Sequence, residues 1–156
     1  MKILLIGNGA REHCIAEALT RSGKAQLVTF AKARNPGIAK LSNVYEQGSL
    51  SDFEAVKNFA RAQKPDFAVI GPDDPIAEGA ADALKEVGVT SVAPLKTLAR
   101  LESSKSFTRD LVAKYSIPGN PVFKVFTETA GMNTFIDQLD GNYVIKADGL
   151  MGGKGV

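Results

Sequence analysis

The stretch that decides the fold is Lys2-Ile3-Leu4-Leu5-Ile6-Gly7-Asn8-Gly9-Ala10-Arg11-Glu12-His13. Its apolar run, residues 3–6, is short and stops at a glycine, which is typical of a buried strand in a parallel sheet. Apolar residues then recur at helical spacing from Ile15 to Leu19. The stretch therefore predicts a strand, a glycine-rich turn and a helix in direct succession.

The same alternation of short apolar runs and amphipathic segments continues to about residue 94. Further strands are expected at 26–30, 44–47, 67–70 and 91–93. Strands that alternate with helices indicate a parallel sheet with helices on both faces. We therefore predict an α/β, Rossmann-like domain over residues 1–94. Ligands of such sheets bind at the carboxyl ends of the strands, where the loops 7–13 and 71–75 lie.

Local signals add detail to this domain. Asn35-Pro36-Gly37 predicts a turn. Ser51, with Glu54 three residues later, predicts a capping box at the start of a helix. Apolar residues from Ile76 to Val87 recur with helical spacing and predict one continuous helix. Cys14 is expected to be a small buried residue of the first helix.

The pattern changes after Pro94. A short helix is expected over residues 95–101, and Ser104 is expected to open the next helix. The remaining expected elements are strands at 122–126 and 143–147, a helix over 132–139 and a glycine-rich loop at 149–155. This loop follows a strand directly, as the first glycine-rich loop does.

The composition excludes several classes of protein. Of the 156 residues, 44% are hydrophobic and 23% are charged, and the net charge is +2. This charge is too small to indicate a nucleic acid or an anionic membrane as a partner. One cysteine and one histidine exclude an internal disulfide and a metal site built from either residue. No apolar run approaches the ~18 residues of a membrane span, so we expect a cytoplasmic protein.

The loop from Gly7 to His13 has the context of a phosphate site. It follows a strand and opens a helix, whose free N–H groups favour an anion. It departs from the dinucleotide fingerprint, which has glycine or alanine where this chain has Glu12. No acid follows the second strand, although Lys32 and Arg34 could face a 2′-phosphate. Three interpretations of this loop stand open: a site for a bound phosphate, part of an NADP-binding redox domain, or glycines that only tighten the turn.

Two acidic residues and the second glycine-rich loop are further candidates. Asp73 and Asp74 either stabilise the first turn of the next helix or face a ligand. The loop at 149–155 lacks the first glycine and the hydroxyl residue of a Walker A motif. It is therefore either a flap over a triphosphate, with Lys146 beside it as a fixed charge, or a plain glycine-rich hairpin.

Taken together, these motifs resemble the glycinamide ribonucleotide synthetase (phosphoribosylamine–glycine ligase) family of the ATP-grasp superfamily. The matching stretches occur in the family's order and span nearly the whole chain: 7–13, 35–37, 71–73, 101–107, 117–118, 144–149 and 152–156. Ala10 and Ser103 stand where the family usually has glycine, and Asp73 stands where it usually has glutamate. None of these departures reverses the polarity of its position.

The resemblance implies an ATP-dependent ligase that joins glycine to 5-phosphoribosylamine through glycyl phosphate, in purine biosynthesis. It also implies roles for individual residues. The residues expected to contact ATP are Lys105, Lys146, Gly149, Gly152, Gly153, Lys154 and Gly155. The residues expected to contact 5-phosphoribosylamine are Gly7, Gly9, Arg11, Glu12 and Asp73.

The resemblance further implies a division of the chain. Residues 1–94 are expected to form the substrate-binding domain, 95–103 a linker, and 104–156 an incomplete ATP-grasp domain. Family members continue much further, and the carboxylates that hold Mg²⁺ lie in that later part. We therefore expect a fragment of a longer protein, inactive by itself. The alternative is a non-catalytic nucleotide-binding domain of Rossmann-like fold.

Overall fold

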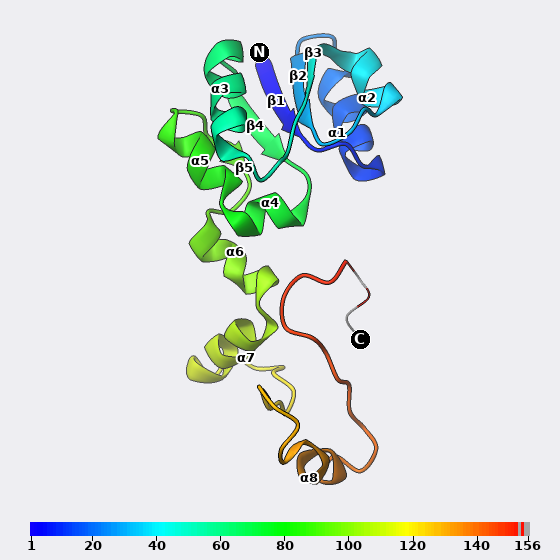
Figure 1. Cartoon of the computed structure of the whole chain (residues 1–156), viewed down its shortest axis with the longest axis vertical. Helices are drawn as coiled ribbons and strands as arrows, with labels where there is room; N and C mark the ends of the chain where they lie inside the picture. Colours follow the sequence, from blue (N-terminus) through cyan, green and yellow to red (C-terminus); the bar gives the residue numbers. More distant parts are fainter. Residues whose placement is uncertain (153, 155–156) are drawn as a thin grey trace. The chain divides into compact units, whose positions relative to one another are not determined.

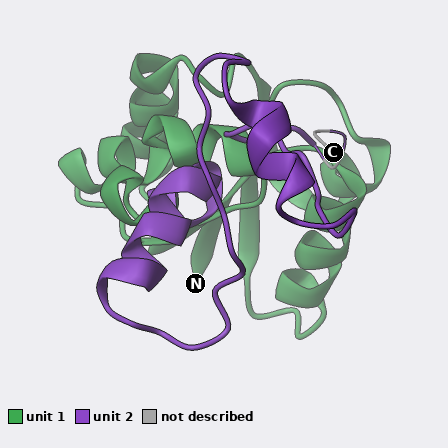
Figure 2. Ribbon diagram, turned by 90° about the horizontal axis from the view of Figure 1, so that it is seen from below, with its two compact units in different colours: residues 1–99 green, residues 100–156 purple. Residues whose placement is uncertain are grey.

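The computed structural model describes residues 1–152 and residue 154. The chain divides into two compact units, residues 1–99 and 100–156, which Figure 2 shows in green and purple. The boundary falls inside helix α6 (Lys96–Ser103), in the stretch predicted as a linker. None of the described helices is long and apolar enough to cross a membrane.

The first unit is built on a parallel sheet with the strand order β3-β2-β1-β4-β5. The strands are β1 (Lys2–Ile6), β2 (Gln26–Ala31), β3 (Ser42–Gln47), β4 (Phe67–Ile70) and β5 (Ser91–Val92). The helices are α1 (Ala10–Thr20), α2 (Pro36–Leu41), α3 (Phe53–Gln63), α4 (Asp73–Glu78) and α5 (Ala80–Glu86). The predicted α/β class and its parallel sheet are confirmed.

Side chains alternate between the two faces of the sheet and fill two cores. From the central strand β1, Leu4 and Ile6 pack in one core with residues of α3 and α5. Ile3 and Leu5 pack in the other core with residues of α1 and α2. Figure 1 accordingly shows α1 and α2 on one side of the sheet and α3 and α5 on the other. This packing leaves the carboxyl edge of the sheet to the loops.

Four local predictions for this unit are wrong. Residues 35–37 begin helix α2 rather than a turn, because the Asn35 side chain accepts the N–H groups of the helix's first turn. Asp52, not Ser51, caps α3, since the Ser51 hydroxyl donates to Glu78 instead. The helix predicted over 76–87 is broken at Gly79, whose φ of +115° cannot continue a helix.

The fourth wrong prediction concerns Cys14, which is exposed. Ala16, two residues later, is the fully buried residue of α1. Positions two apart on a helix point in different directions, so the burial of one does not extend to the other.

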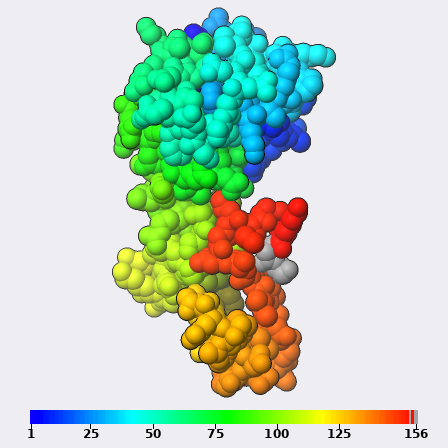
Figure 3. Space-filling model, in the orientation of Figure 1, coloured from blue at the N-terminus to red at the C-terminus, as the bar shows by residue number. Residues whose placement is uncertain are grey.

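The second unit is helical where the sequence predicts helices, but it has no strand among its described residues. Helix α7 (Lys105–Lys114) begins at Ser104, whose Oγ accepts the Phe107 N–H, and α8 (Met132–Asp137) follows. The segments 122–126 and 143–147, predicted as strands, are irregular. A strand needs a hydrogen-bonded neighbour, and here apolar side chains such as Val122 and Val144 are 77% and 66% exposed. In Figure 3 the first segment is coloured yellow-orange and the second orange to red.

Candidate functional site

The glycine-rich loop between β1 and α1 lies at the carboxyl edge of the sheet, as predicted. Gly7 has a φ of +124°, which favours glycine, and its N–H donates to the carbonyl of Phe30 on the neighbouring strand at 3.0 Å. Gly9 is the N-cap residue of α1. The first N–H groups of α1 have no intrahelical acceptor, so they are the donors that this loop can offer to an anion.

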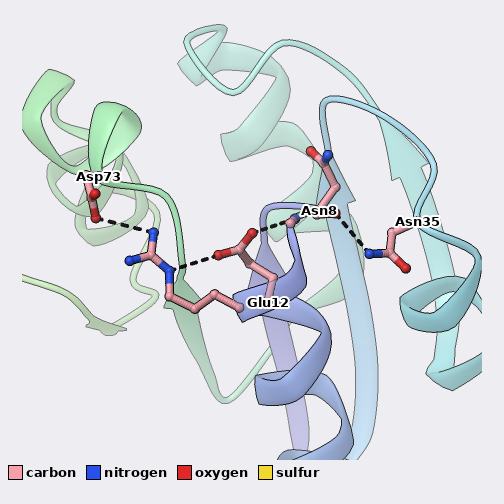
Figure 4. Close-up of polar contacts among 6 residues, drawn as sticks. Asn8, Glu12, Asn35 and Asp73 are labelled. Carbon is pink, nitrogen blue, oxygen red and sulfur yellow. Dashed lines mark hydrogen bonds and ion pairs between the residues drawn. The ribbon is translucent and has the colours of Figure 1, made fainter. Parts of the chain in front are cut away.

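Glu12 lies beneath this loop and is only 4% exposed. Its Oε2 accepts the N–H of Gly9 at 2.6 Å, and its Oε1 accepts the Nε of Arg11 at 3.4 Å (Figure 4). One half of a capping box is thereby formed, from the third helical residue back to the N-cap. The carboxylate is engaged with the protein's own groups.

Arg11 links the loop after β1 to the loop after β4. Its guanidinium lies between Glu12 and Asp73, and its Nη2 is 3.4 Å from Asp73 Oδ1 (Figure 4). Arg11 and Asp73 are 62 residues apart in the sequence. Both acids after β4 stand in the first turn of α4, where negative charge is stabilising. Asp74 in addition lines a cavity, and its contact with a ligand stays a prediction.

Asn35 holds the same loop from the other side. Its Nδ2 donates to the carbonyl of Asn8 at 3.0 Å (Figure 4). Its Oδ1 accepts the N–H groups of Gly37 and Ile38. Gly37 packs so closely on the ring of His13 that a Cβ would overlap it. The Asn-Pro-Gly motif therefore joins α2 to the β1–α1 loop, a role that its interpretation as a turn missed.

A cavity of about 360 Å³ opens at this edge of the sheet. It is lined by Asn8, Gly9, Glu12, Lys32, Ser49, Leu50, Ser51, Pro72, Asp74, Pro75 and Glu78. These lining residues include one cation, Lys32, and three carboxylates, those of Glu12, Asp74 and Glu78. Sequence reasoning missed residues 49–51 and Glu78. The loop 49–51 follows β3, so the rule applied to the loops after β1 and β4 would have found it.

The described part of the second glycine-rich segment contacts the start of α7. The Oδ1 of Asp148 accepts the backbone N–H of Lys105 at 2.6 Å and that of Ser106 at 3.3 Å, and its Oδ2 accepts the hydroxyls of Ser104 and Ser106. The Ser106 hydroxyl, with these N–H groups, lowers the pKa of Asp148 to about 2 from its ordinary 3.8. The anion at the start of α7 is thus a side chain of the protein.

The predicted ATP contacts fall around this junction. Lys105 Nζ donates to the carbonyl of Gly149 at 2.6 Å, which places an ammonium group at the start of the glycine-rich loop. Lys146 is exposed. The N–H of Lys154 donates to the carbonyl of Met151 at 3.0 Å, and Gly152 between them has a φ of +55°. Gly153 and Gly155 lie outside the described residues.

The residues that the structure describes offer no metal site. No group of three or more His, Cys, Asp or Glu side chains among them is placed to hold a metal ion. Glu12, Asp74 and Glu78 line the cavity. Glu12 and Asp73 pair with Arg11, and Glu78 accepts the Ser51 hydroxyl.

Comparison with models of protein families identifies the class of this protein as ATP-grasp. A model described as "Phosphoribosylglycinamide synthetase, ATP-grasp (A) domain" matches residues 103–156. A model described as "Phosphoribosylglycinamide synthetase, N domain" matches residues 1–102. The chain belongs to the phosphoribosylglycinamide synthetase family.

Curated relatives agree with this family. A phosphoribosylamine–glycine ligase of Methanocaldococcus jannaschii is 47% identical over 160 residues, which cover 100% of this chain and 36% of that protein. A phosphoribosylamine–glycine ligase of Pyrococcus abyssi is 43% identical and is matched over 35% of its length. The chain thus spans about a third of the length of the curated relatives that it matches.

Solved structures share the fold. An ADP complex of an N5-carboxyaminoimidazole ribonucleotide synthetase has a TM-score of 0.76 at 15% identity, over 99% of this chain and 39% of that one. A phosphoribosylglycinamide synthetase from Anaerococcus prevotii has a TM-score of 0.61 at 17% identity, over 87% of this chain and 34% of that one. At these identities the likeness is one of fold.

Proposed function

We propose that this chain supplies the sugar-phosphate site and part of the ATP site of a cytoplasmic phosphoribosylamine–glycine ligase. The observation that carries the proposal is the cavity at the carboxyl edge of the sheet, between the β1–α1 loop and the loop after β4. Parallel α/β sheets bind their ligands at this edge. Within this proposal residues 1–94 bind substrate, 95–103 connect, and 104–156 contact ATP.

The cavity suits a small sugar phosphate that carries an amine. The phosphate is anionic, so it belongs with the first N–H groups of α1 and with the ammonium of Lys32. The amine and the ribose hydroxyls are hydrogen-bond donors, so they belong with the carboxylates of Asp74 and Glu78. Arg11 and Asp73 border this arrangement by joining its two loops. Arg11 and Asp73 would contact the substrate through the side-chain nitrogen and oxygen atoms that their ion pair does not use.

On the ATP side, three lysines neutralise phosphate charge. Lys105 and Lys146 flank the start of the glycine-rich loop, and Lys154 lies on it. Glycines from Gly149 to Gly155 let the backbone approach the phosphates closely, because they carry no side chain. Catalysis of phosphoryl transfer is mostly positioning and charge neutralisation, which is what such a set of residues provides.

The proposed reaction has two steps. A carboxylate oxygen of glycine attacks the γ-phosphorus of ATP, the bond to the bridging oxygen breaks, and ADP leaves with glycyl phosphate as product. The amine of 5-phosphoribosylamine then attacks the acyl carbon, inorganic phosphate leaves, and the nitrogen loses a proton as the amide forms. Activation is needed because a carboxylate is a poor electrophile.

Reactions of this class use Mg²⁺ to bridge phosphate oxygens, with oxygen ligands from the protein. The described residues do not fit such a site, since none of their carboxylates gather to hold a metal. No step is therefore assigned here to a metal held by this chain.

Titration calorimetry of the 156-residue chain tests the sugar-phosphate site. Ribose 5-phosphate is expected to bind more tightly than NADP⁺, and Lys32→Met is expected to weaken it about tenfold, the worth of one charged hydrogen bond. Lys40→Met, at an exposed lysine of α2, is the matched control and should change nothing. Tighter binding of NADP⁺ would reverse the assignment in favour of a dinucleotide domain.

Phosphate release that depends on both glycine and 5-phosphoribosylamine tests the ligase activity. The 156-residue chain by itself is expected to show none, because the family resemblance puts the Mg²⁺ ligands outside the matched stretches. Glycine-dependent release by the chain alone would contradict this expectation.

A further inference from the structure

Three glycines from two loops that are far apart in the sequence, Gly7, Gly9 and Gly71, share one neighbour. A Cβ placed on Gly7 would lie 2.7 Å from Glu12 Cγ, and a Cβ on Gly9 would lie 2.7 Å from Glu12 Oε2. A Cβ on Gly71, in the loop after β4, would lie 2.6 Å from Glu12 Cδ. Real Cβ atoms do not approach other atoms so closely. The side chain of Glu12 therefore occupies the space that a Cβ on any of these three glycines would need.

The backbone torsions alone do not explain this set. Gly7 has a positive φ, but Gly9 has a φ of −78°, which any residue can adopt. The feature that Gly9 and Gly71 have in common with Gly7 is the contact with Glu12. The two loops at the carboxyl edge are thus shaped around one buried carboxylate.

That carboxylate also occupies one of the backbone donors of the loop, the N–H of Gly9. The N–H of Gly7 donates to Phe30, that of Gly71 donates to Ile6, and that of Gly9 donates to Glu12 at 2.6 Å. The donors left for a ligand are those of the first turn of α1. In a dinucleotide fingerprint the second glycine lets the backbone approach the pyrophosphate, and the third lets the helix pack closely on the sheet. Here the second glycine is Gly9, and its N–H is already bonded to Glu12.

We infer that Glu12 is a positioning residue that sets the β1–α1 loop for a single phosphate group and excludes the pyrophosphate of a dinucleotide. The identity of the phosphate ligand rests on the proposed function. The shape of the loop is independent of that function. Glu12 acts through the Gly9 N–H and through the volume that it occupies, not by touching the reacting atoms.

The test compares Glu12→Ala, Glu12→Gln and Gly9→Ala with the unaltered 156-residue chain. Alanine satisfies the dinucleotide fingerprint at position 12, and glutamine keeps both the size and the acceptor. Gly9→Ala needs no strained φ and displaces the carboxylate sterically, which covers the case in which Glu12→Ala does not fold. Each variant is titrated with ribose 5-phosphate and with NADP⁺, and amide exchange at residue 9 is followed by NMR.

The ratio of ribose 5-phosphate affinity to NADP⁺ affinity is expected to fall about tenfold or more in Glu12→Ala and Gly9→Ala, and to stay within about threefold in Glu12→Gln. Amide exchange at residue 9 is expected to accelerate in Glu12→Ala and Gly9→Ala but not in Glu12→Gln. A purely structural role would weaken both ligands alike and leave the ratio unchanged, and that result would overturn the inference.

The experiments distinguish a failure of the sugar-phosphate assignment from a failure of the positioning role of Glu12. If the unaltered chain binds no ribose 5-phosphate but the Gly9 N–H depends on Glu12, the sugar-phosphate assignment fails and the positioning of the loop stands. If the Gly9 N–H exchanges equally fast with and without the Glu12 carboxylate, the positioning role fails whatever the ligand is.

Discussion

The side-chain amide of Asn35 donates a hydrogen bond to the carbonyl of Asn8 at 3.0 Å, and thereby ties the start of α2 to the glycine-rich loop after β1 (Figure 4). The same side chain caps α2 through its Oδ1. One residue thus fixes a helix and a candidate phosphate loop at once, which couples the stability of the unit to the shape of its site.

Two substitutions at Asn35 distinguish its role as the cap of α2 from its hydrogen bond to Asn8. Asn35→Ala is expected to lower the free energy of unfolding by about 1–2 kcal/mol, because an N-cap is lost. Asn35→Asp keeps a capping oxygen but loses the donor to Asn8, so it should be closer to the unaltered chain in stability. Both should weaken ribose 5-phosphate binding, by about threefold to tenfold, the worth of one hydrogen bond. Urea unfolding and titration calorimetry measure the two effects.

The control is Asp66→Ala, which removes a side-chain bond to the N–H of Lys2 at the amino end of the sheet. It is expected to reduce stability without changing the ligand affinity. Unchanged binding in Asn35→Asp would show that the bond to Asn8 does not shape the loop.

The contact between Gly71 and Glu12 predicts a non-additive double mutant. Gly71→Ala alone is expected to cost about 1–3 kcal/mol of unfolding free energy, because its methyl group overlaps the carboxylate. With Glu12→Ala the overlap disappears, so the double mutant should be more stable than the sum of the single effects by about 1 kcal/mol or more. Thermal or urea unfolding of the four chains gives the coupling energy.

Gly88→Ala serves as the comparison for this cycle. Gly88 has a φ of +78° but no atom within 4 Å of its Cβ direction, so alanine is strained there without a clash. Its effect should add to that of Glu12→Ala within about 0.5 kcal/mol. Additivity in the Gly71 cycle as well would remove the evidence that Glu12 shapes this loop.

The lowered pKa of Asp148 predicts an acid-dependent contribution to the stability of the second unit. Because the folded pKa, about 2, lies below the ordinary value of 3.8, the contribution is complete above about pH 4 and is lost as the pH falls through 2. Asp148→Asn should abolish this dependence.

A carboxyl NMR titration of Asp148 measures its pKa directly. Ser106→Ala should raise this pKa, because the Ser106 hydroxyl contributes most to the shift. Asp110→Asn, at an exposed site on α7, should leave the Asp148 titration as it is; an ordinary Asp148 pKa would disprove the assigned contacts.

Substitutions of Lys146 and Lys105 are predicted to differ in their effect on stability but not in their effect on ATP binding. Lys146 is exposed, so Lys146→Ala should change stability by less than about 0.5 kcal/mol. Lys105→Ala also removes the bond to the Gly149 carbonyl and should loosen the second unit. Both should weaken ATP binding about tenfold or more, as expected for a charged contact to phosphate. Calorimetry with ATP measures this, with Lys114→Ala at the far end of α7 as control; equal ATP affinity in all four chains would exclude these contacts.

The sequence by itself determined the parallel α/β unit. Short apolar runs such as residues 3–6 and 67–70, each followed by glycine, specify buried strands locally, and their alternation with helices leaves few topologies. The capping signal at Ser104 is likewise local, because the side chain bonds an N–H three residues away. The family resemblance then predicted roles for individual residues in the loops.

Only the tertiary structure decided how the candidate site is put together. Arg11 reaches Asp73 across 62 residues, and the Lys105 N–H reaches Asp148 across 43, so neither contact leaves a periodic signal in the sequence. Glu12, whose contact with the substrate stays a prediction, is buried against three glycines because the loops after β1 and β4 converge on it. The segments 122–126 and 143–147 have the apolar character of strands but are irregular, since a strand exists only when a neighbour accepts and donates its backbone hydrogen bonds. Local pattern sets which segments can form an element, and long-range pairing decides which of them do.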